Sequence, residues 1–98
     1  MLIKEKTKNL IVMRINNLID QHNKKLIDKA KRHGLKLWKR DLLTPYKVAK
    51  QGDFHVSTIN SILNGANKDP KFSTIENICL GLGITIQEFF NDELFDNK

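Results

Sequence analysis

The sequence predicts an all-α domain, and three observations lead to that prediction. Apolar residues recur every three or four positions between Ile11 and Ala30, which places them on one face of a helix. Later segments begin at capping residues such as Thr44 and Thr85 and end at Asn or Gly. Alternating β-branched residues, the usual signal of a strand, are missing, and only Leu35–Trp38 could form a strand.

The first helix is expected from about residue 3 or 7 to residue 30 or 33. Gly34 stops it, and three basic residues in its last turn face the negative end of the helix dipole. On its apolar face we expect His22 to pack at the core or its boundary rather than to bind a ligand. The face consists of Ile11, Ile15, Leu18, His22, Leu26 and Ala30, widened by Leu10, Ile19 and Ile27.

Four short helices are expected after an unassigned segment at 35–43. Thr44 is a suitable cap for the first of them, and Pro45 suits its first position. Leu94 and Phe95 are expected to pack back on the body. The expected helices cover residues 45–51, 55–63, 75–82 and 86 to about 91. The other expected N-terminal caps are Ser73 or Thr74 and Thr85. The expected C-terminal stops are Asn64-Gly65, Gly81 and Gly83.

Residues 45–63 are predicted to form a helix-turn-helix, with a turn at Gly52-Asp53-Phe54. Val48 and the small Ala49 face inward from the first helix, and Ile59 faces back from the second. The outward face of the second helix carries short polar side chains that reach base edges, and it carries no acid that would repel phosphates. That face consists of Val56, Ser57, Asn60, Ser61 and Asn64.

Length and composition bound the class of protein. A chain of 98 residues with 40% apolar and 29% charged content suits a single globular domain with a modest core, 1–98. Its apolar runs fall far short of the roughly 20 residues that span a bilayer, and its charged N-terminus lacks the features of a secretory signal. We therefore expect a cytoplasmic protein that does not enter a membrane.

Cysteine and histidine give no sign of a metal or a cofactor. The single cysteine, Cys79, excludes a disulfide framework, and the histidines are too dispersed for a metal site. Cys79 lies in an apolar run and is expected to be inert core. The acidic residues are scattered, so an enzyme such as a nuclease is not expected.

The charge is unevenly divided. Residues 1–50 hold 14 basic and 4 acidic side chains, whereas residues 51–98 hold 3 basic and 7 acidic ones. A basic half on a small domain indicates a polyanionic partner, and a merely solvated surface is the alternative.

The run from Leu43 to Gly65 resembles the phage lambda repressor/Cro-like (XRE-type) helix-turn-helix family. Residues 68–70, 74–75, 80–84 and 88–90 resemble the helices that follow in that family. The resemblance implies a lambda-repressor-like five-helix DNA-binding domain whose recognition helix, at 55–63, enters the major groove. We expect base contacts from Val56, Ser57, Thr58, Asn60 and Ser61. We expect DNA backbone contacts from Thr44, Tyr46, Lys47, His55 and Asn64.

The sequence departs from that family in three places. Pro45 replaces a usual glutamine, which removes one phosphate contact. Asp53 stands where a turn glycine is common, and aspartate tolerates the left-handed conformation. Residues 24–42 form a basic insertion between the first helix, aligned through residues 11–23, and the helix-turn-helix. The chain thus divides into 1–42, a long helix plus insertion, and 43–92, the helix-turn-helix core with its following helices.

The insertion holds eight of the seventeen basic residues and only two acids. We expect it to clamp the DNA backbone through Lys31, Arg32, Lys36 and Lys39. The alternatives are an extended first helix with a solvated face and a dimerisation element. Trp38 is expected to anchor the insertion to the body or to a second subunit, with stacking on a base as the other reading.

Taken together, the sequence predicts a sequence-specific regulator that binds double-stranded DNA, a repressor, with no small-molecule ligand evident. A homodimer is expected because one short recognition helix rarely gives enough specificity. The alternative is a protein-interaction module, such as an antitoxin or an accessory protein. A membrane-surface role for Leu35–Arg40 is a further, weaker alternative.

Overall fold

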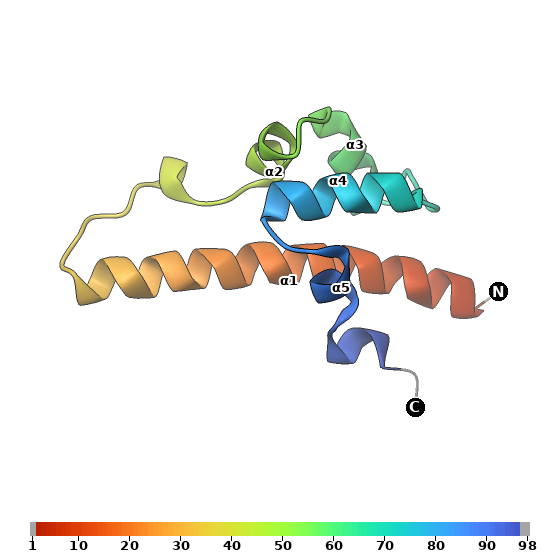
Figure 1. Cartoon of the computed structure of the whole chain (residues 1–98), viewed down its shortest axis with the longest axis horizontal. Helices are drawn as coiled ribbons and strands as arrows, with labels where there is room; N and C mark the ends of the chain where they lie inside the picture. The colour runs from red at the N-terminus through yellow and green to blue at the C-terminus, as the bar shows by residue number, and fades with distance from the viewer. Residues whose placement is uncertain (1, 97–98) are drawn as a thin grey trace.

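The computed structural model describes the backbone of residues 2–96 and the side chains of residues 10–96. Every regular element in that part of the chain is helical, which confirms the all-α prediction, and residues 35–38 are irregular rather than a strand. In Figure 1, α2, α3 and α4 lie on one side of the long α1, and the chain then crosses α1 to α5 and η2. The elements are α1 (Leu2–Arg32), η1 (Lys39–Asp41), α2 (Pro45–Gln51), α3 (Val56–Leu63), α4 (Phe72–Leu82), α5 (Ile86–Phe90) and η2 (Glu93–Phe95), where η marks a 3₁₀ turn.

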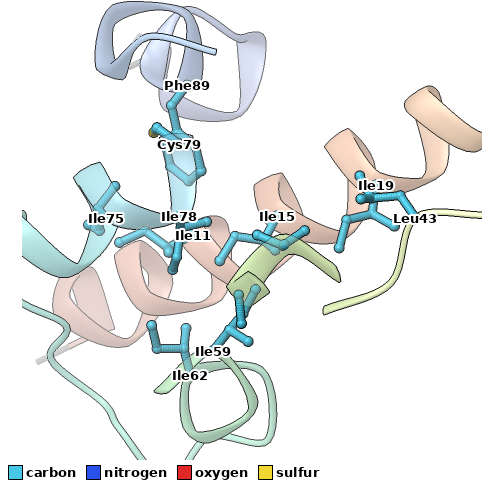
Figure 2. Packing of buried hydrophobic residues seen from close by; sticks show 12 residues of the cluster. Ile11, Ile15, Ile19, Leu43, Ile59, Ile62, Ile75, Ile78, Cys79 and Phe89 are labelled. Carbon is cyan, nitrogen blue, oxygen red and sulfur yellow. The ribbon is translucent and has the colours of Figure 1, made fainter. Parts of the chain in front are cut away.

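The core is built on the apolar face of α1. Ile11, Ile15 and Ile19 are buried there against residues of α2 to α5 (Figure 2). The helix continues past the body, so its distal half has little to pack against (Figure 1). His22 was predicted at the core or its boundary; it lies at the boundary, on the rim of a pocket lined by Leu43, Leu82 and Ile84, and it is exposed rather than packed in the core.

The helix-turn-helix forms as predicted. Thr44 caps α2 by accepting a hydrogen bond from the Lys47 backbone N–H at 3.3 Å. Asp53 takes the left-handed conformation, with φ of 56°, so aspartate does serve the turn in place of glycine. The buried Ala49 lets α3 approach closely, and Ile59 fills the space between the two helices. Local caps and burial therefore hold α3 in place.

Helix α4 ends at Leu82 as predicted but begins three residues earlier than predicted. Its first residue is Phe72 and its N-cap position is Lys71, so neither Ser73 nor Thr74 is its cap. Exposed first-turn N–H groups are solvated by water, which makes a side-chain cap dispensable. Gly81 lies inside the helix, where a Cβ atom would overlap the Val48 carbonyl. It is required for the close contact of α4 with α2, and Gly83, with φ of 75°, ends the helix.

The last elements are held by a buried arginine, Arg14, which no pattern in the sequence had singled out. Thr85 and Glu88 form the capping box of α5, as the cap at Thr85 predicted. At the other end of α5 the Arg14 guanidinium donates to the Phe89 carbonyl at 2.6 Å and to the Glu88 carbonyl at 2.8 Å. It also pairs with Asp92 at 3.1 Å. The cation thus binds two carbonyls of a short helix at its negative end, one of which, on Glu88, also accepts from the Asn91 N–H.

Residues 24–42 project from the body, and we call this segment the arm. Its base is closed by the Asn23 side chain, which donates to the Leu43 carbonyl at 3.0 Å and accepts from the Leu43 N–H at 2.7 Å. The outgoing limb is the end of α1, and the return limb is irregular up to η1 (Figure 1). No helix among residues 2–96 is long and apolar enough to cross a membrane.

Candidate nucleic-acid interface

The outward face of α3 presents short polar side chains. Ser57, Asn60 and Asn64 are exposed, and Thr58 and Ser61 are half-buried. Val56 departs from the prediction in part, because it packs against the buried cluster and leaves only some of its surface free. No residue of α3 is acidic. This face therefore offers hydroxyl and amide groups without a charge that would repel phosphates.

His55 caps α3 and contacts the first polar residue of that face. Its Nδ1 accepts a hydrogen bond from the Ser57 backbone N–H at 3.4 Å and lies 3.0 Å from the Ser57 Oγ. His55 therefore contacts both the backbone and the hydroxyl group of Ser57 at the start of α3.

The start of α2 lies beside the start of α3. Tyr46 is 57% exposed, and it lines a shallow pocket with Lys50, Phe54 and His55. The Lys50 ammonium lies 5.8 Å from the centroid of the Tyr46 ring. Lys50 was missed by the sequence analysis, although its spacing of four from Tyr46 places the two on one helix face.

Lys47 is committed to the arm rather than left free. Its ammonium donates to the Arg40 carbonyl at the end of η1. This contact links the arm to the first turn of α2, close to the Thr44 cap. The basic residues of the arm assigned to the DNA backbone are all exposed: Lys31, Arg32, Lys36 and Lys39.

Trp38 does not anchor the arm to the body. Its side chain is 51% exposed and lies outside the buried cluster. Its ring instead faces two cations of the arm, with the Lys36 ammonium 4.4 Å and the Arg40 guanidinium carbon 5.7 Å from the centroid. The other predicted role of Trp38, anchoring the arm to a second subunit, stays a prediction.

The remaining candidate groups are structural. Cys79 is buried, and burial raises the pKa of its thiol to about 11, with the nearby Glu76 acting in the same direction. The thiol is therefore protonated and unreactive at neutral pH. Among the side chains of residues 10–96, no three His, Cys, Asp or Glu groups gather in a way that would hold a metal ion.

Comparison with known proteins defines the class. A family model described as a Cro/C1-type helix-turn-helix DNA-binding domain matches residues 35–94. The match covers more than half of the chain, including α2 to α5, and the chain belongs to this family of DNA-binding transcriptional regulators. Neither the curated proteins nor the solved structures contain a match.

The family match does not include α1. The matched range begins at residue 35, within the return limb of the arm, so α1 and the outgoing limb lie outside it. The alignment of residues 11–23 with a first family helix therefore stays a prediction. What α1 does in this chain is clear from its contacts: it supplies one wall of the core and the Arg14 cap of α5.

Proposed function

We propose that this protein is a sequence-specific repressor of transcription that reads double-stranded DNA with α3. The observation that carries the proposal is the outward face of α3, which combines exposed polar groups, no acid and a buried apolar opposite face. Side chains of this kind recognise base edges in the major groove, where each base pair presents its own donor and acceptor pattern. Ser57 and Asn60 are the central readers.

The flanking elements supply contacts to the DNA backbone, which do not depend on the base sequence. The N-terminus of α2, with Thr44 and Tyr46, approaches one phosphate strand, as does His55 at the start of α3. The exposed cations of the arm neutralise further phosphates. Repression requires no more than occupancy of a promoter, so this is the sign of regulation that we assign. Two copies related by a two-fold axis would read two half-sites.

Selection from a random duplex library tests this proposal. We expect one enriched motif with a palindromic arrangement for the wild-type chain. Ser57→Ala and Asn60→Ala should each relax the preference at one position of the motif by about 1–3 kcal/mol. Asn17→Ala, an exposed asparagine of α1, is the matched control and should return the wild-type motif.

The outcomes separate the two candidate functions. If Ser57→Ala and Asn60→Ala enrich the same motif as the Asn17→Ala control, α3 does not read the bases. Failure of the wild-type chain to enrich any duplex would favour the protein-interaction module, which uses the same fold without DNA readout.

A further inference from the structure

Trp38 is an exposed aromatic side chain on a segment that holds it in a defined position. Its backbone N–H donates to the Asp41 carboxylate at 3.0 Å, and its carbonyl accepts from the Asp41 N–H at 2.9 Å. This closed turn is η1. A ring that keeps half its surface in water while its backbone is fixed is placed for a contact that the isolated chain does not make.

The surroundings of the ring define the chemistry of that contact. Lys36 and Arg40 approach the indole at 4.4 Å and 5.7 Å from its centroid, so two positive charges lie close to the flat apolar ring. The rest of the arm adds six basic side chains and two acids. A partner that fits must offer flat apolar surface with negative charge beside it. Sugar and base edges flanked by phosphates have this pattern.

The position of the arm points to the groove involved. The Lys47 ammonium binds the Arg40 carbonyl and thereby holds η1 against the first turn of α2. Figure 1 shows η1 and α3 on opposite sides of α2. In a docked helix-turn-helix the first helix meets the phosphate strand and the second lies in the major groove. An element on the far side of that strand meets the adjacent minor groove.

We propose that Trp38 makes a second, largely non-ionic DNA contact, in which the indole packs against deoxyribose and base edges of the minor groove next to α3. Lys36 and Arg40 pair with the phosphates on its two sides. This inference rests on the proposed function, since it needs duplex DNA as the ligand. It differs from the phosphate clamp because an indole contact releases no counterions and adds nothing to the salt dependence.

Tryptophan fluorescence reports on this contact directly, because Trp38 is the only tryptophan in the chain. Acrylamide, a neutral quencher, measures how accessible the indole is in the full chain. We expect a selected duplex with flanking base pairs to reduce the quenching constant several-fold. A duplex that ends at the α3 half-site should still bind but should leave Trp38 accessible.

Variants separate the aromatic contact from charge. Trp38→Ala should weaken duplex binding about tenfold with an unchanged slope of log affinity against log salt. Trp38→Phe should keep most of the affinity. Phe72→Ala removes an aromatic side chain that is 61% exposed on α4, away from the arm, and is the matched control with wild-type affinity. Circular dichroism checks that each variant remains helical.

Three results would overturn the proposal. If the duplex binds and Trp38 stays fully accessible, the indole contact is wrong while the proposed function stands. If quenching falls with protein concentration in the absence of DNA, Trp38 faces a second copy of the chain instead. If no duplex binds the wild-type chain, the proposed function and this inference fail together.

Discussion

The helix-turn-helix at residues 43–65 and the arm at residues 24–42 adjoin in the chain but are held by different forces. Four residues of the former, Val48, Ala49, Ile59 and Ile62, are almost completely buried. In the arm only Ala30 is buried, and the segment is held at its base by Asn23 and near η1 by Lys47. Buried apolar contacts hold a reading helix rigidly against the core, whereas the arm is held in place by a few polar contacts with little buried surface.

The difference suits two kinds of contact with DNA. Base readout depends on hydrogen-bond geometry and needs a rigid platform. Phosphate contacts depend mainly on charge and tolerate small displacements. We therefore expect mutations in the two regions to fail in different ways, and the following predictions test this from the largest effect to the smallest.

The largest effect is expected for truncation in the core of the helix-turn-helix. Ile59 is 0% exposed, so Ile59→Ala should lower the free energy of unfolding by about 2–5 kcal/mol. Leu35→Ala, in the arm, removes a side chain that is 65% exposed and should change it by less than about 0.5 kcal/mol. Urea denaturation measures both. Equal losses would show that the arm is as tightly packed as the helix-turn-helix.

Removal of charge from the arm should act on binding and spare the fold. Replacement of Lys31, Arg32, Lys36 and Lys39 by glutamine should weaken selected and random duplexes by similar factors. If three of the four residues contact phosphates, the slope of log affinity against log salt should flatten by roughly 2.7. Lys68→Gln with Lys71→Gln, two exposed lysines outside the arm, is the control. A quadruple variant with the wild-type slope would refute the clamp, and a change of mass in solution would indicate a dimerisation element.

Loss of the two hydrogen bonds between the Asn23 side chain and the Leu43 backbone should lower the stability of the arm. Asn23→Ala leaves the N–H and carbonyl of Leu43 without their side-chain partner and should cost about 1–3 kcal/mol. Hydrogen exchange should accelerate in residues 33–42 and stay slow in α3, because α3 keeps its own buried contacts. Asn17→Ala should change neither quantity. Faster exchange throughout α3 would mean that the two regions unfold as one unit.

The smallest effect concerns the thiol in the core. The pKa of Cys79 is raised from 9.0 to about 11, so the folded state retains its proton more tightly than the unfolded state. The stability that this provides is complete below pH 9 and is lost as the pH rises toward 11. Stability of the wild-type chain should fall more steeply over that range than stability of Cys79→Ala. Identical pH profiles, or rapid labelling of the folded thiol at pH 8, would contradict the burial.

Much of the fold was accessible from the sequence because its signals are local. The caps at Thr44 and Thr85, the stop at Asn64-Gly65 and the left-handed turn at Asp53 each involve residues within about four positions of one another. The outward face of α3 followed from helical periodicity in the same way. The assigned DNA contacts of that face and of the arm stay predictions.

The errors arose where a residue's environment is set by distant parts of the chain. His22 lies on the predicted apolar face yet is exposed, because it lies at the rim of a pocket with Leu43, Leu82 and Ile84 rather than under them. Gly81 was interpreted as a helix end, but it marks where α4 touches Val48. Trp38 was expected against the body or a second subunit; it does not pack in the core of the body, and its side chain is 51% exposed.

The sequence by itself determined the all-α class, the helix-turn-helix and the division into a basic and an acidic half. Only the tertiary structure decided that Arg14 caps α5, which it meets across 74 and 75 positions of the chain. It likewise decided that Asn23 closes the arm on Leu43 and that the Trp38 ring lies close to two cations. The physical reason is range: caps and periodicity act within a turn or two, whereas burial and long-range hydrogen bonds exist only once the helices have packed.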